Sequence, residues 1–118
     1  MSSGLRTIVV AVIVVIAAIA VFSEAQALSA RSLYGKWCTA GGSEEFGDTS
    51  LIAIPRSGER HRFRIREYEV GRDAVTVHWT NGKGEHVSTD FGEFSADGKR
   101  MVQLRNEEGP RREFRRCG

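Results

Sequence analysis

The chain has 118 residues with 17 basic and 15 acidic side chains, which gives a formal net charge of +2. This length allows one domain, and a charge so close to neutral argues against binding to nucleic acid. The sequence has neither a phosphate-binding glycine loop nor a G-x-S-x-G nucleophile motif, so we expect no cofactor and no enzymatic activity.

The N-terminal segment has the pattern of a secretory signal. One basic residue, Arg6, precedes the apolar run 8–22, and Ala25-Gln26-Ala27 fits the small-residue rule of signal peptidase. The run is shorter than the roughly 20 residues that span a bilayer as a helix. We therefore predict a signal peptide over residues 1–27 and an exported domain, periplasmic or secreted, over residues 28–118. The alternative is an inner-membrane anchor formed by residues 8–22.

Beyond Ala30 the sequence alternates apolar and polar residues over short stretches separated by turn residues, which is typical of an all-β domain. The expected strands lie, in chain order, near 33–38, 46, 52–54, 61–70, 75–79, 87–91, 101–106 and 111–117. The links between them are of hairpin length. The sequence therefore predicts seven or eight antiparallel strands in a meander, closed as a small barrel or a rolled sheet.

Two local features predict the strand register. The apolar phase changes within 61–70, which indicates a bulge near Arg66 or Glu67. The turn at residues 81–84, with sequence Asn-Gly-Lys-Gly, is the strongest hairpin signal in the chain. We predict that Val77 pairs with Val87 across it, which would place His78 opposite His86.

The predicted inner face is apolar and bulky. We expect Val102 and Leu104 to point inward, and the two tryptophans to belong to the core rather than to a ligand platform. A barrel of this size would be filled by its own side chains, which leaves little room for an enclosed ligand. The predicted filling residues are Trp37, Phe63, Val77, Trp79, Phe91 and Phe114.

The two cysteines, Cys38 and Cys117, lie in the first and last predicted strands. In an oxidising compartment this pair is expected to form a disulfide that joins the two ends of the meander. The alternation places Cys38 and Phe114 on opposite faces, so we expect the bridge to lie outside the main core.

Arginines at every second position of one predicted strand form the main candidate binding site, for anionic lipid or another envelope polymer. Their side chains would stand about 7 Å apart in a row. The alternative is a solvated face paired with acidic residues of neighbouring strands. The row comprises Arg60, Arg62, Arg64 and Arg66, and a second basic cluster comprises Arg111, Arg112, Arg115 and Arg116.

Other chemistry has weaker support in the sequence. His78 and His86, with Asp90 on the same strand, could hold zinc, but no short-spaced ligand motif accompanies them, so we predict no metal site. A secreted enzyme would need a cleft that gathers His61, His78 or His86 with acidic groups.

Parts of the sequence resemble two groups of known proteins. Gly35-Lys36-Trp37, with Arg115 or Arg116 near the end of the chain, resembles the calycin superfamily. There a late arginine lies across a tryptophan ring at the closed end of the barrel, a cation–π contact. Segments 35–38, 75–81, 90–98 and 110–117 resemble a group of small bacterial exported proteins of uncharacterised activity. The calycin-like ends and the export signal together favour a non-enzymatic envelope module that binds a protein or small molecule.

Overall fold

The structure is a computed structural model that describes residues 27–104 and 110–118. The predicted signal peptide lies outside the described residues except for Ala27, and the alternative anchor lies wholly outside them. Within the described residues, no helix is long and apolar enough to cross a membrane.

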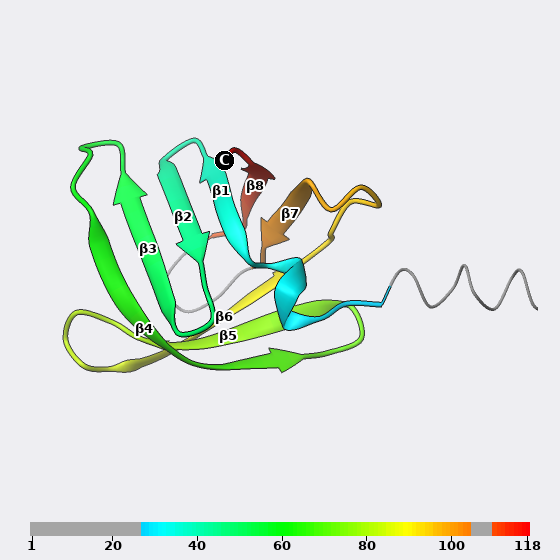
Figure 1. Cartoon of the computed structure of the whole chain (residues 1–118), viewed down its shortest axis with the longest axis horizontal. Helices are drawn as coiled ribbons and strands as arrows, with labels where there is room; N and C mark the ends of the chain where they lie inside the picture. The colour runs from blue at the N-terminus through cyan, green and yellow to red at the C-terminus, as the bar shows by residue number, and fades with distance from the viewer. Residues whose placement is uncertain (1–26, 105–109) are drawn as a thin grey trace, which may run out of the picture.

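The described residues form eight antiparallel strands that follow one another in chain order, and the last pairs with the first to close a barrel (Figure 1). The predicted all-β meander is therefore confirmed, in its barrel form. The strands are β1 (Gly35–Thr39), β2 (Gly42–Phe46), β3 (Ser50–Pro55), β4 (His61–Val70), β5 (Ala74–Thr80), β6 (His86–Gly92), β7 (Arg100–Gln103) and β8 (Arg112–Arg116).

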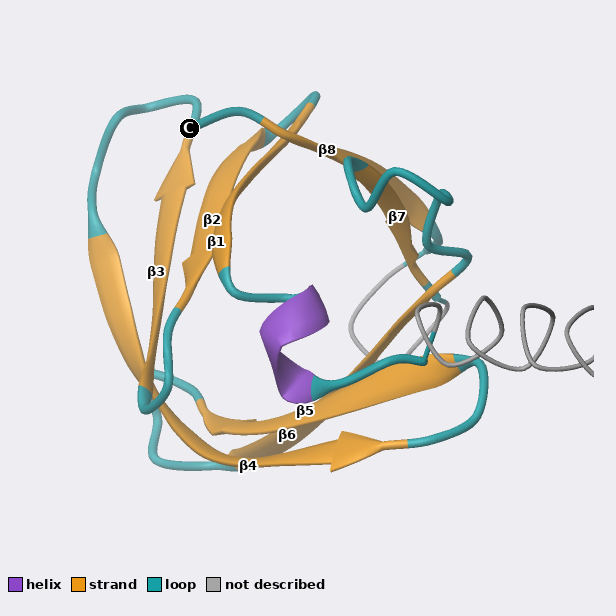
Figure 2. Ribbon diagram, turned by 45° about the vertical axis from the view of Figure 1, so that its right-hand side comes forward, coloured by secondary structure: helices purple, strands orange, loops and turns teal. Residues whose placement is uncertain are grey.

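A single 3₁₀ turn, η1 (Ala30–Ser32), lies within the ring of strands before β1 begins (Figure 2). Leu33, directly after it, is fully buried, and its carbonyl accepts a hydrogen bond of 2.8 Å from the Trp37 indole N–H. We call this end of the barrel the sealed end. The β1–β2, β3–β4 and β5–β6 turns lie at the other end, which we call the hairpin end.

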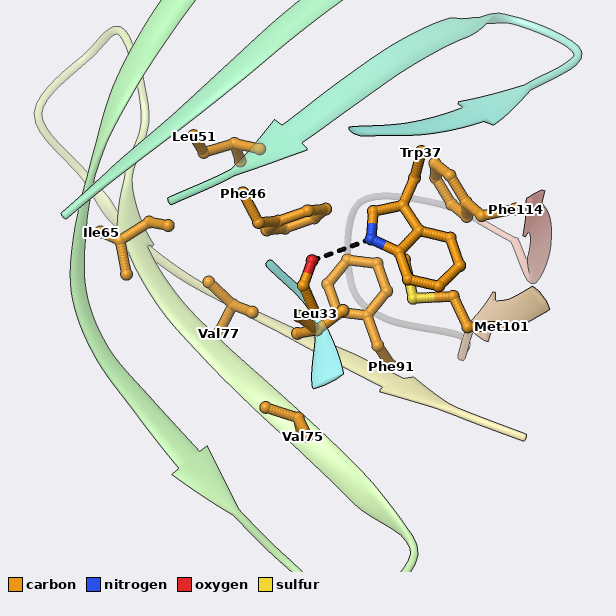
Figure 3. Close-up of a cluster of buried hydrophobic side chains, with 10 residues drawn as sticks. All are labelled: Leu33, Trp37, Phe46, Leu51, Ile65, Val75, Val77, Phe91, Met101 and Phe114. Atoms are coloured by element: carbon orange, nitrogen blue, oxygen red, sulfur yellow. Dashed lines mark hydrogen bonds between the residues drawn. The ribbon is translucent and has the colours of Figure 1, made fainter. Parts of the chain in front are cut away.

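The core consists of the alternate side chains that point into the barrel (Figure 3). Four of the predicted filling residues are at most 3% exposed, whereas Phe63 and Trp79 are partly buried and pack against the others. The fully formed core also includes residues of β2, β3 and β7. The buried members of the cluster are Leu33, Trp37, Phe46, Leu51, Ile65, Val75, Val77, Phe91, Met101 and Phe114.

The predicted bulge in the long strand is confirmed. The β4–β5 register shifts between Ile65 and Glu67, so the inward row changes from Phe63 and Ile65 to Tyr68. The Tyr68 hydroxyl donates a 2.6 Å hydrogen bond to the Gly47 carbonyl. Because of the bulge, the ten-residue strand β4 points Phe63 inward near the hairpin end and Tyr68 inward near the sealed end.

The predicted register of the β5–β6 hairpin is wrong by two residues. Val77 pairs with Thr89, and Trp79 pairs with Val87. The loop is longer than expected because the Asn81 side-chain oxygen accepts hydrogen bonds from the backbone N–H groups of Lys83 and Glu85, at 3.0 and 2.9 Å. Gly84 closes the loop with φ +78°, a conformation that favours glycine. A shift of two preserves the faces of both strands but changes every cross-strand partner.

The inward face of β7 also differs from the prediction. Met101 pairs with Phe114 and is 1% exposed, so it belongs to the core, whereas Val102 is buried on the other face of the strand. Leu104 lies beyond the end of β7, and its Cδ1 atom packs close to Gly92. The prediction failed because both faces of β7 are covered, and hydrophobicity alone does not then identify the inner one.

The Cys38–Cys117 disulfide is present and joins residues 79 apart in the sequence. Cys38 follows the inward Trp37 and lies opposite Arg115 of β8, so the bridge lies on the outer side of the barrel, as predicted. It stands directly beside the seam where β1 and β8 close the ring.

Candidate functional site

The sealed end is held by one arginine. The guanidinium carbon of Arg116 lies 4.2 Å from the centre of the Trp37 ring, within cation–π range. Its three nitrogens donate hydrogen bonds to the backbone carbonyls of Gly98, Tyr34 and Ser32, at 2.9, 2.6 and 3.0 Å. The contact between a late arginine and this tryptophan is therefore present, and Arg116 makes it. Arg115 is cross-strand partner to Cys38 and points outward.

Gly35 completes this arrangement by leaving space for the arginine. A Cβ atom on Gly35 would lie 2.8 Å from Nη1 of Arg116, and the residue has φ +109°, a conformation that side chains rarely adopt. The glycine, the tryptophan two residues later and Arg116 therefore form one unit. Its role is to close the barrel, since all its partners are backbone carbonyls or core atoms.

Three of the four arginines of the predicted row lie on β4. Arg62, Arg64 and Arg66 are exposed on the outer side of β4, whereas Arg60 lies in the loop before the strand. Thr49 and Ser50 border a depression beside the three arginines. We call this surface of Arg62, Arg64, Arg66, Thr49 and Ser50 the arginine face. It offers guanidinium and hydroxyl groups, the donors that bind phosphate oxygens.

The alternative of cross-strand pairing with acidic residues does not describe this face. Arg62 lies opposite Ile52, and Arg64 lies between Ser50 of β3 and Thr80 of β5. Arg66 contacts the ring nitrogens of His86. Over residues 27–104 and 110–118, no carboxylate lies within ion-pair distance of Arg62, Arg64 or Arg66. The positive charge of the arginine face is therefore left for solvent or a ligand.

The second basic cluster is dispersed over three environments. Arg111 forms an ion pair with Glu93, Arg112 points into the barrel, and Arg116 seals its end. Arg115 faces outward beside Arg100 of β7. These residues do not form one anion-binding surface.

The residues considered for zinc are also separated. The corrected register places His78 opposite Ser88, while His86 contacts Arg66 and Asp90 accepts a hydrogen bond from the Thr76 hydroxyl. The described residues contain no group of three or more potential metal ligands.

His78 takes part in a different arrangement that the sequence did not predict. Its Nδ1 atom lies 2.8 Å from the Ser88 hydroxyl, and its Nε2 atom lies 3.2 Å from a carboxylate oxygen of Glu69. A serine, a base and an orienting carboxylate are the elements of a nucleophilic site. Hydrolysis also requires donors aimed at the developing oxyanion. The backbone of β5 around His78 is already paired with strands on both sides, so we assign no hydrolytic role to this group.

A polar cavity of about 120 Å³ lies inside the barrel. Phe46 and Phe91 form part of its wall (Figure 3), and Trp79 lies toward the hairpin end with its indole N–H donating to the Thr89 hydroxyl at 3.1 Å. Three polar side chains from β2, β7 and β8 also line it, namely Glu44, Gln103 and Arg112.

Glu44 has an unusual environment in this cavity. Its side chain is 19% exposed, and within the described part of the chain its buried Oε2 atom has no hydrogen-bond partner. Its Oε1 atom lies 3.8 Å from Nη2 of Arg112, which instead donates a 2.7 Å hydrogen bond to Gln103. Burial raises the pKa of the Glu44 carboxyl, and the nearby Arg112 guanidinium lowers it by a smaller amount. A titratable carboxyl group is thus retained in the lumen with part of its hydrogen-bonding capacity unused.

Sequence reasoning missed Glu44, Gln103 and Arg112 as lumen residues. The signal was present in the alternation, because Glu44 is in phase with Phe46 and Arg112 is in phase with Phe114. Charged residues in such positions are normally read as solvent-facing, since they are rarely buried.

Replacing Glu44 with methionine should stabilise the protein. Because the folded pKa is raised above the unfolded value, the folded state holds more protons between the two values, and stability falls as pH rises through that window. Removing the carboxylate leaves no buried charge, since the Arg112 side chain is 42% exposed. We expect Glu44→Met to raise the free energy of unfolding at pH 7 by about 1–3 kcal/mol, with a smaller gain at pH 4, measured by urea denaturation.

The neighbouring Glu45 provides the matched control, because it is exposed on the outer side of β2. Glu45→Met should change stability by no more than about 0.5 kcal/mol. A lower free energy of unfolding in Glu44→Met would show that the Glu44 carboxylate stabilises the fold.

Comparison of the chain with protein-family models, curated proteins and solved structures finds no match.

Proposed function

We propose that this domain is a non-enzymatic binding module that acts outside the cytoplasm, in the periplasm or secreted, and contacts phosphate-bearing lipid through the arginine face. The proposed location is supported by the disulfide, which persists in oxidising compartments, and by the signal-like sequence of residues 1–27. A surface contact is favoured over an enclosed large ligand because the lumen cavity of about 120 Å³ is well below the 300–1,000 Å³ of drug-sized sites.

The observation that carries the proposal is the absence of acidic partners for Arg62, Arg64 and Arg66 in the described structure. Arginines that are already paired with carboxylates across strands would contribute little to the binding of an anion. Unpaired arginines in a row can each approach a separate phosphate, and the Thr49 and Ser50 hydroxyls lie at the edge of the same depression. The small net charge of the chain makes this a local attraction rather than a general one.

The test is binding to vesicles of phosphatidylglycerol compared with phosphatidylcholine. A juxtamembrane arginine contributes about 1 kcal/mol near an anionic surface. The double variant Arg62→Ser/Arg64→Ser should therefore bind phosphatidylglycerol vesicles about thirtyfold more weakly, by the usual conversion of 1.4 kcal/mol per factor of ten. Binding of the unaltered protein should weaken as salt rises, since exposed charges are screened.

The charge-matched control is Arg100→Ser/Arg115→Ser, a cross-strand pair on β7 and β8 at the other side of the barrel. This variant loses the same charge and should retain binding. Inorganic polyphosphate is the second probe, and tighter binding to it than to vesicles would indicate an anionic polymer instead of lipid. Equal, salt-insensitive binding by both double variants would refute a role for the arginine face.

A further inference from the structure

The lumen cavity holds an acidic and a basic side chain that take no part in the arginine face. Glu44 from β2 and Arg112 from β8 both line it, yet their closest atoms are 3.8 Å apart, beyond hydrogen-bond distance. A directly hydrogen-bonded pair would have satisfied both groups. The observed separation leaves the buried Oε2 atom of Glu44 without a described partner.

Arg112 also retains binding capacity. Its guanidinium has five N–H donors, and within the described part of the chain it makes one hydrogen bond, from Nη2 to Gln103. The group is further positioned by the Phe114 ring, whose centre lies 5.3 Å from the guanidinium carbon. Gln103 and Phe114 thus hold the cation in the cavity wall while most of its donors stay available.

Size and charge limit what could occupy the cavity. About 120 Å³ corresponds to roughly four water molecules at about 30 Å³ each. A lone cation would satisfy Glu44 but would also approach Arg112, and a lone anion would have the opposite conflict. A molecule with both an ammonium and a carboxylate group adds no net charge and presents a partner to each residue. Phe46, Trp79 and Phe91 provide an apolar wall for its hydrocarbon part.

We propose that the barrel lumen binds a small zwitterion, an α-amino acid with little or no side chain, with its ammonium group on Glu44 and its carboxylate on Arg112. Such a ligand has roughly five or six non-hydrogen atoms, which makes a millimolar dissociation constant realistic. The site is independent of the arginine face, since Glu44 and Arg112 point inward while the arginine face lies on the outer surface of β4.

The two tryptophans provide a reporter and an internal control for the test. The Trp79 indole N–H bonds Thr89 at the cavity, whereas the Trp37 indole N–H bonds the Leu33 carbonyl at the sealed end. In ¹H–¹⁵N spectra, glycine and alanine should shift the Trp79 indole signal saturably and leave the Trp37 signal in place. Leucine should be excluded by size. Methylammonium and acetate, each carrying one of the two charges, should bind at least tenfold more weakly than glycine.

Matched neighbours provide the variants. Glu44→Gln and Arg112→Gln should each weaken glycine binding at least tenfold, whereas Glu45→Gln and Arg111→Gln should not change it. An unchanged Trp79 signal with up to about 0.1 M glycine or alanine would overturn the proposal, leaving water as the occupant. Methylammonium binding as tightly as glycine would also overturn it, in favour of a simple cation site. The comparison of probes uses the unaltered protein, so it decides the question even if a variant fails to fold.

Discussion

Replacing both cysteines with serine is expected to lower the free energy of unfolding by about 4–5 kcal/mol. The disulfide joins residues 79 apart, and cross-linking so long a loop removes much of the conformational entropy of the unfolded chain. Domains of this size have a total stability of only about 5–15 kcal/mol. The effect should appear as a large fall in the urea midpoint of Cys38→Ser/Cys117→Ser relative to the oxidised protein.

The position of the bridge explains why little else compensates for its loss. The β1–β8 ladder that closes the barrel contains two register pairs, Trp37 with Arg116 and Cys38 with Arg115. The disulfide starts from one of these pairs and reinforces this short ladder. Reduction of the unaltered protein is the control and should reproduce the double variant. Unchanged midpoints in both would mean that the core and this short ladder hold the ring closed by themselves.

The strands, and the faces of most of them except β7, could be predicted because the alternation along this chain is regular. The bulge near Arg66 was visible as a change of apolar phase, and the structure places it between Ile65 and Glu67. The hairpin register was not visible in the same way. It depends on the Asn81 side chain, whose two hydrogen bonds to backbone N–H groups make a longer loop than an Asn-Gly sequence normally indicates.

Among the candidate residues, the inward or outward direction of a side chain was easier to predict than its partners. The sequence left Arg115 and Arg116 open as the partner of Trp37. Arg116 makes the contact, because it is two positions from Phe114 and therefore points inward with it. The period of two also places Arg112, with Phe114, and Glu44, with Phe46, in the lumen. Sequence analysis missed them because charged side chains are expected to face solvent. Whether an exposed arginine has an acidic partner depends on the neighbouring strands. That no carboxylate of residues 27–104 and 110–118 pairs with Arg62 or Arg64 follows from the alignment of β3 and β5 with β4.

The sealed end carries the second large expected effect. Trp37→Ala should lower the free energy of unfolding by about 3–5 kcal/mol, the usual cost of removing a large buried side chain, because the indole is fully buried and its loss also leaves the Leu33 carbonyl unpaired. Arg116→Ala should cost about 1–3 kcal/mol, since three carbonyls lose a charged donor. Urea denaturation measures both.

The double variant Trp37→Ala/Arg116→Ala separates the two roles of this arginine. If the guanidinium is held by the ring as well as by the carbonyls, the two losses overlap, and the double variant should be less destabilised than the sum by about 0.5–2 kcal/mol. Arg115→Ala is the control, because Arg115 directly follows the core residue Phe114 and points outward, and it should be additive with Trp37→Ala. Additivity in both cycles would mean that Arg116 seals the barrel through its hydrogen bonds alone, and that the tryptophan fills the end of the core without fixing the arginine above it.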